Sequence, residues 1–325
     1  MAYATDILGK CVDETKQLFF PIRKKYWLKM GFLSLFSGRN SGSGGNGFNS
    51  SRTSGNNEDI STFFENLKTE GISFFTQYGV LVGIGVFFIW LISLFFVFLN
   101  SVFTFVFIEG IIKKDVSIKK GFKNNKKLGV SLFALRFILS LVILLLILLI
   151  ASPLLYSLIM GNISNFNFWL LIPIGLALFF MLLCFGIFWF LVYDFVVPIM
   201  YMKKYSFFRA WNYFKKICKK KKMEIFIYWL MKIALSIGIS IVSLFLMIPV
   251  FLLMLIIAIP FVLLGVGIYL LINLLNNTAA ILTVIPYGII VVLLFIYLIS
   301  VVFVPFKAFM TKYSIEMVKK LEGKS

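Results

Sequence analysis

Histidine is absent from all 325 residues of the sequence. Its absence excludes nucleophile pairs that use an imidazole as base, and metal sites with imidazole ligands. The three cysteines, Cys11, Cys184 and Cys218, are too widely separated to form a metal-binding or disulfide pattern. We therefore expect no metal, no cofactor and no enzyme activity in this chain.

Charge is also scarce. Charged residues make up 14% of the chain and hydrophobic residues 61%. No charged residue occurs in 137–193 or in 233–306. Because a membrane-spanning helix needs about 20 apolar residues, each stretch is long enough for two crossings. The sequence therefore predicts an all-α, polytopic helical membrane protein with a single membrane domain, 1–325.

Apolar runs, prolines and polar breaks divide the chain into predicted elements. These are amphipathic helices at 5–20 and 58–78, a short apolar segment at 26–37, a Gly/Ser/Asn-rich loop at 38–57, and spans near 79–108, 129–152, 168–202, 225–248 and 279–306.

The apolar stretch 249–277 is the hardest to assign. It contains Pro249 and Pro260 and follows directly on a predicted span. As a further full crossing it would leave the Lys-rich C-terminal tail outside, against the positive-inside rule. We therefore expect it to re-enter the membrane or to lie along the outer face. The prediction is then about six membrane-inserted elements, built as repeated hairpins joined by basic cytoplasmic amphipathic helices.

The formal net charge is +19, from 32 basic and 13 acidic residues. The basic residues gather in short segments beside apolar runs, at 113–127, 203–222 and 307–324. This pattern indicates cytoplasmic loops of a protein of the cell membrane rather than a nucleic-acid-binding protein. The expected partners are the anionic lipids of the inner leaflet, with a protein partner as a further possibility.

Three junctions between a span and a basic segment resemble one another, around Ser117, Ser206 and Ser314. The repetition predicts one unit used three times, in which a span ends and the serine caps an interfacial helix. The helix expected at 206–222 is the strongest example. Its candidate face for lipid or partner binding comprises Arg209, Lys215, Lys216, Lys219 and Lys220.

The N-terminal region has two possible placements. If 5–20 is a divergent copy of the repeated unit, the N-terminus lies inside and 26–37 belongs to a short, irregular first crossing. Alternatively, the whole N-terminal region lies outside and the chain first crosses at 79–108. The repeat favours the inside placement.

Several short motifs resemble a family of uncharacterised multi-pass membrane proteins of archaea and bacteria. They are Asp194-Phe-Val-Val-Pro-Ile-Met-Tyr201 followed by Ala210-Trp211, Phe105-Val-Phe-Ile-Glu109, Phe20-Pro21 with Trp27-Leu28-Lys29, and Ile285-Pro-Tyr287. That family is similar to the membrane domain attached to some glycerophosphodiester phosphodiesterases. The resemblance implies a helical membrane fold and supplies no active site, because this chain has neither a phosphodiesterase domain nor a histidine.

Three ionisable residues fall inside apolar runs and are candidate functional residues: Asp194, Arg136 and Lys232. Each lies nine or ten residues from a basic segment, so all three are expected at a similar depth. An ion pair can then form, and Arg136 is the favoured partner of Asp194 because a guanidinium pairs with a carboxylate through two hydrogen bonds. Pro198 should also free the backbone carbonyl of Asp194. The group can fix helix register, bind an ion or substrate, or merely snorkel.

These observations predict a non-enzymatic integral membrane protein whose basic helices bind the inner leaflet or a partner. The alternative is a secondary transporter or channel that uses Asp194 and Arg136. A lipid-modifying enzyme is the least favoured class, because the sequence shows neither a cluster of carboxylates nor a nucleophile paired with a base.

Overall fold

A computed structural model describes residues 3–20, 23–37, 60–159, 169, 171–274 and 277–323. These residues contain helices and no strand, which confirms the all-α class. In chain order the elements are α1 (Tyr3–Phe19), α2 (Lys24–Phe36), α3 (Ile60–Lys113), α4 (Ile118–Ile159), α5 (Leu171–Leu191), the π-helical turn η3 (Val192–Val196), α6 (Val197–Lys203), α7 (Phe207–Lys220), α8 (Lys222–Asn273) and α9 (Asn277–Leu321).

Five of the described helical segments are long and apolar enough to cross a membrane. They are Gly83–Lys113, Ile118–Ile150, Ile172–Lys203, Lys222–Ile272 and Ala279–Leu321. The predicted class of multi-pass helical membrane protein is therefore confirmed. Within the described residues the candidate spans number five, close to the predicted count of about six, because two predicted elements are halves of one helix.

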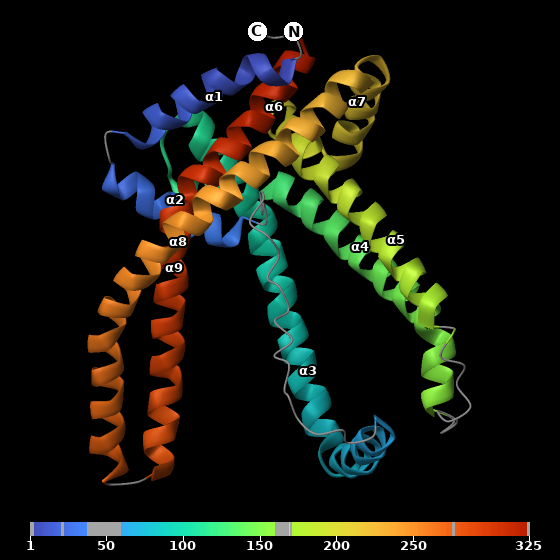
Figure 1. The fold of residues 1–325 in the computed structure, drawn as a ribbon, viewed down its shortest axis with the longest axis vertical. Helices are drawn as coiled ribbons and strands as arrows, with labels where there is room; N and C mark the ends of the chain where they lie inside the picture. The colour runs from blue at the N-terminus through green and yellow to red at the C-terminus, as the bar shows by residue number, and fades with distance from the viewer. Residues whose placement is uncertain are drawn as a thin grey trace.

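That helix is α8, which runs without interruption through Pro249 and Pro260. The helix therefore has no boundary at 248, where the sequence predicts the end of a span. Helices of membrane proteins tolerate internal prolines where neighbouring groups satisfy the freed carbonyls or the helix bends. In Figure 1, α8 first passes obliquely across the molecule and then turns to run beside α9.

The second half of α8 pairs with α9 in an antiparallel hairpin. The Tyr287 hydroxyl of α9 donates to the Phe261 carbonyl at 2.7 Å, and the ring of Tyr287 lies against Gly265. Residues 249–273 thus form the first half of a helical hairpin, and α9 returns the chain to the end from which α8 started (Figure 1). No helix boundary separates 225–248 from 249–273, so the described residues form no separate re-entrant element here.

One end of the molecule is closely packed, and we call it the packed end. It contains α1, α2, α6 and α7 together with the adjoining parts of the long helices (Figure 1). The buried apolar side chains come almost entirely from this end, from residues such as Phe105, Phe195, Tyr228 and Tyr313. Three arms extend from it: α3, α4 with α5, and α8 with α9. Their apolar side chains are largely exposed, as expected for surfaces that lipid covers.

The N-terminal helix α1 lies antiparallel to the end of α9. Three ion pairs join them in a regular ladder: Asp6–Lys320 at 2.8 Å, Lys10–Glu316 at 3.3 Å and Glu14–Lys312 at 2.6 Å. Each helix contributes one charge per turn with alternating sign, so only this register pairs all six charges. The predicted apolar face of α1 is buried between the helices, including Ile7, Cys11 and Leu18. Helix α1 therefore lies beside the basic end of α9.

The predicted short segment 26–37 forms α2, which packs between α3 and α9. Tyr26 donates its hydroxyl to the Gly110 carbonyl at 3.2 Å, and Ser300 donates to the Gly31 carbonyl at 3.0 Å. Gly31 is required there, since a Cβ would stand 3.1 Å from the Val301 Cα and closer still to its side chain. The loop predicted at 38–57 lies outside the described residues. From Ile60 onward, the predicted elements 58–78 and 79–108 are one helix.

The three serine junctions fold in different ways. Only Ser206 precedes a separate amphipathic helix, α7, and its side chain makes no capping hydrogen bond. After Ser117, α4 continues from Ile118 directly into its span, and α9 passes through Ser314 without a break. The predicted thrice-used unit is therefore wrong for Ser314, whose hydroxyl has a different role.

Candidate functional site

Asp194 lies in the π-helical turn η3 and is 2% exposed. Pro198 has no N–H, so it cannot bond the carbonyl of Asp194 four residues earlier. The backbone instead widens, and the N–H of Val197 bonds the carbonyl of Val192, five residues back. Ser314, from α9, donates its hydroxyl to the freed Asp194 carbonyl. The expected release of this carbonyl thus occurs, and a helix distant in sequence satisfies it.

The Asp194 carboxylate forms an ion pair with Lys232 of α8, whose ammonium donates to Oδ2. The hydroxyl of Tyr228 lies 3.4 Å from the same oxygen. Tyr228 and Lys232 are four residues apart and therefore share one face of α8. Lys232 is 7% exposed, and its Nζ also lies 4.9 Å from the centre of the Phe190 ring. The pair is thus removed from water and held from two helices.

Arg136, the favoured partner of Asp194 in the sequence, is bound elsewhere. Its guanidinium donates to Asn100 Oδ1 at 2.5 Å and to the hydroxyl of Tyr193, and it lies 5.4 Å from the Tyr193 ring centre. The choice of Arg136 over Lys232 as the ion-pair partner is therefore wrong. Consecutive side chains of a helix point about 100° apart, so Tyr193 and Asp194 reach different neighbours. Arg136 ties α3 and α4 to η3, whereas Lys232 ties η3 to α8.

The chemistry of this site follows from its composition. Among the residues described by the structure, no three Cys, Asp or Glu side chains lie close enough to hold a metal ion. A buried carboxylate beside an ammonium can fix the packing of helices, since removing one member leaves an uncompensated charge. The same pair can also exchange a proton or a cation where a π-turn leaves helix geometry irregular.

The basic face predicted on 206–222 lies on α7. Phe207, Ala210 and Phe214 of this helix are buried in the packed end. The opposite face carries the predicted set, all of whose members are exposed: Arg209, Lys215, Lys216, Lys219 and Lys220. Ser131 of α4 accepts a hydrogen bond from the Phe207 N–H at 3.0 Å and fixes the start of the helix.

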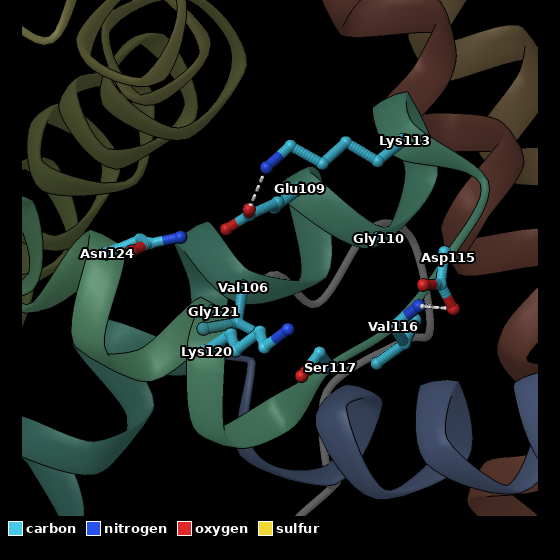
Figure 2. A pocket seen from close by; sticks show the side chains of 10 residues that line it. All are labelled: Val106, Glu109, Gly110, Lys113, Asp115, Val116, Ser117, Lys120, Gly121 and Asn124. Atoms are coloured by element: carbon cyan, nitrogen blue, oxygen red, sulfur yellow. Dashed lines mark hydrogen bonds and ion pairs between the residues drawn. The ribbon is translucent and has the colours of Figure 1, made fainter.

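A second buried polar group lies where α3 meets α4 (Figure 2). Glu109 accepts hydrogen bonds from Lys113 at 2.5 Å and from the side chain of Asn125. Lys204 lies 3.4 Å from Asn125 Oδ1 and adopts the left-handed conformation, with φ of 55°. Burial lowers the pKa of Lys204. This group connects α3 and α4 to the turn between α6 and α7.

Sequence reasoning missed the partners that complete both groups. The role of Tyr228 could have been predicted, because it precedes Lys232 by one helical turn. The ladder between α1 and α9 could also have been predicted, because charges of alternating sign recur every four residues in both segments. The roles of Ser314 and Asn125 could not, because only the packing of distant helices brings them to Asp194 and Glu109.

The arrangement defines a polytopic helical membrane protein with a buried ion pair at its packed end. The sequence pattern of DUF7544, a family of unknown function, matches residues 2–324, and the chain belongs to that family. Neither a curated protein nor a solved structure matches the chain.

Proposed function

We propose that this chain is a non-enzymatic protein of the cell membrane whose packed end faces the cytoplasm and binds anionic lipid headgroups through α7. The observation that carries the proposal is the division of α7 into a buried apolar face and an exposed face with five basic side chains. Its apolar face is already occupied by the rest of the protein, so the basic face is what α7 offers to its surroundings.

Electrostatics favours the inner leaflet as the surface that this face meets. Each Lys or Arg held near an anionic leaflet contributes about 1 kcal/mol at physiological ionic strength. Phe208, which is 72% exposed, and the half-buried Trp211 add aromatic groups suited to the headgroup layer. The basic turn after α3 and the basic end of α9 lie at the same end of the molecule as α7 (Figure 1).

The proposal is tested by reconstituting the full chain in bilayers of phosphatidylcholine with a minor fraction of spin-labelled phosphatidylglycerol. Replacing Lys215, Lys216, Lys219 and Lys220 together by Gln should lower the association constant for phosphatidylglycerol, and added salt should reduce the difference between variant and wild type. The matched control changes the same four residues to Arg, which keeps the charge and should keep the preference.

An association constant that the Gln variant leaves unchanged would contradict lipid binding by α7 and would point to a protein partner for this face. The side of the membrane is tested separately. Single cysteines in place of Lys120 and Lys219 should resist impermeant thiol reagents added from outside intact cells, and labelling at either would invert the proposed topology.

A second candidate function is secondary transport, with Asp194 and Arg136 lining the pathway. The observation in its favour is the π-turn, which places a buried carboxylate beside an ammonium within a candidate span. Asp194→Asn should then abolish a proton or substrate flux into proteoliposomes, while Asp194→Glu should retain part of it. Equal stability loss in both variants without any flux in the wild type would contradict transport.

A further inference from the structure

A cavity of about 180 Å³ lies between the end of α3 and the start of α4 (Figure 2). This volume corresponds to about six water molecules and is well below the roughly 300 Å³ at which pockets begin to enclose drug-sized ligands. Its walls are fixed by close packing. Gly110 and Gly121 line it, and a Cβ on either would stand 2.8 Å from a valine side chain. The ammonium of Lys29, from α2, donates a hydrogen bond to the carbonyl of the lining residue Val116 at 3.0 Å.

The cavity carries charges of both signs. Lys113 and Glu109 face each other at 2.5 Å across its upper edge. Asp115 uses one carboxylate oxygen to accept the Val116 N–H at 2.7 Å, and its other oxygen has no partner within the described ranges. Lys120 has no ion-pair or hydrogen-bond partner there either. Figure 2 shows the side chain of Lys120 extending from the start of α4 into the space below Glu109, and Ser117 at the lower edge of that space.

This charge pattern selects the chemical class of ligand. A purely anionic group would meet Glu109 and Asp115, and a purely cationic one would meet Lys113 and Lys120. A small zwitterion can pair its negative group with the lysines and its positive group with the carboxylates. A phosphate can accept from the Lys120 ammonium and the Ser117 hydroxyl, and a primary ammonium can donate to the carboxylates of Asp115 and Glu109.

The position of the cavity selects the source of the zwitterion. The candidate span Gly83–Lys113 ends at one side of it, and Ile118–Ile150 begins at the other. The turn between two spans lies in the headgroup layer of a bilayer. We propose that this cavity binds the phosphoethanolamine headgroup of a membrane lipid. The site lies on α3 and α4 and is independent of the proposed binding of anionic lipid by α7.

The test is native mass spectrometry of the full chain in detergent, titrated with short-chain phosphatidylethanolamine, phosphatidylcholine or phosphatidylglycerol. Phosphatidylethanolamine should bind about tenfold more tightly than phosphatidylcholine, since a quaternary ammonium has no N–H to donate to a carboxylate. Lys120→Gln should weaken both zwitterionic lipids by about tenfold, because each presents a phosphate to Lys120. Asp115→Asn should weaken phosphatidylethanolamine alone and so reduce the discrimination between the two.

Matched controls are Lys119→Gln and Lys123→Gln, which remove one exposed charge from the same helix without lining the cavity. Both should bind phosphatidylethanolamine as the wild type does. Equal affinity for the three lipids, or a loss in Lys119→Gln as large as in Lys120→Gln, would overturn the proposal. Competition by soluble phosphoethanolamine at the concentration of the lipid would overturn the assignment to a membrane lipid. The α7 Gln variant should leave this preference intact, which separates the two proposals.

Discussion

The side-chain hydroxyl of Ser314 donates to the backbone carbonyl of Asp194, although 120 residues separate them. Both residues are buried, at 0% and 2% exposure. The bond exists because Pro198 cannot satisfy that carbonyl and the helix widens into a π-turn around it. A backbone carbonyl left without an N–H donor in its own helix is thus satisfied by a side chain of α9. This bond joins α9 to the continuous helical segment formed by α5, η3 and α6.

Ser314→Ala should destabilise the protein, because it leaves the Asp194 carbonyl buried without a donor. An unsatisfied buried acceptor costs about 1–3 kcal/mol, which should lower the thermal midpoint measured in detergent. Thr311→Ala is the matched control. Thr311 is equally buried in α9, but its hydroxyl bonds the Lys307 carbonyl within its own helix. If the two variants lose equal stability, the bond to Asp194 has no special role.

Pro198→Ala restores an N–H that can reach the Asp194 carbonyl in ordinary helical geometry. Ser314→Ala should therefore cost less in the Pro198→Ala background than in the wild type. The measurement is a double-mutant cycle on thermal stability, for which adjacent groups give coupling of about 0.5–3 kcal/mol. Additive losses would show that Pro198 is not the reason why Ser314 is needed.

Asp194→Asn should be strongly destabilising, since it leaves the Lys232 ammonium buried without its counter-charge. Breaking a buried ion pair costs about 3–5 kcal/mol, and replacing both members by neutral groups recovers much of it. The variant with Asp194→Asn and Lys232→Met together should therefore be more stable than Asp194→Asn alone. Arg136→Gln in place of Lys232→Met should rescue less, because its guanidinium is bound to Asn100 and Tyr193. Equal rescue by both would contradict the assigned pair.

Gly31→Ala should weaken the packing of α2 on α9. The new Cβ would meet the Val301 Cα at 3.1 Å, and backbone cannot move aside as a side-chain tip can. Overpacking of this kind costs about 1–3 kcal/mol. Gly238→Ala in α8 is the control, because nothing lies within 4 Å of its Cβ position. An unchanged thermal midpoint for Gly31→Ala would mean that α2 does not sit this close to α9.

Cys11 should resist thiol reagents while α1 is docked on α9. It is fully buried, and burial raises the pKa of its thiol to about 12, so almost no thiolate exists near neutral pH. Loosening the ladder with Asp6→Asn, or with high salt, should raise the labelling rate of Cys11. Cys218, which is only half-buried on α7, should label at the same rate in both proteins. Rapid labelling of Cys11 in the wild type would contradict the docked helix.

The same ladder has a defined dependence on acid. The hydrogen bond from Lys320 lowers the pKa of Asp6 below its ordinary value of 3.8. The stabilising contribution of Asp6 is therefore complete above that ordinary value and is lost as the pH falls through the lowered pKa. Cys11 protection that disappeared already between pH 7 and pH 5 would show that another group controls docking.

Much of the architecture could be predicted from local pattern. Charge-free runs required membrane helices, and the periodic stripe of α1 marked its buried face, because both signals lie within a few helical turns. The predicted helix boundaries were wrong where a proline or a short motif can stand either at the end of a helix or inside one. Pro249 and Pro260 suggested a break in α8, yet its pairing with α9 keeps the helix continuous. The short motif around Ser314 resembled a helix start, yet α9 continues through it.

The sequence by itself determined the class of protein, the segments in which its positive charge gathers, and the presence of an acidic residue four positions before a proline. These follow from composition and spacing, which act through transfer to lipid and through local backbone chemistry. Tertiary structure alone decided that Asp194 pairs with Lys232, that Ser314 satisfies its carbonyl, and that a cavity with both signs of charge lies between α3 and α4. The reason is geometric, since residues at one depth all qualify as partners until the rotation of each helix selects which side chains meet.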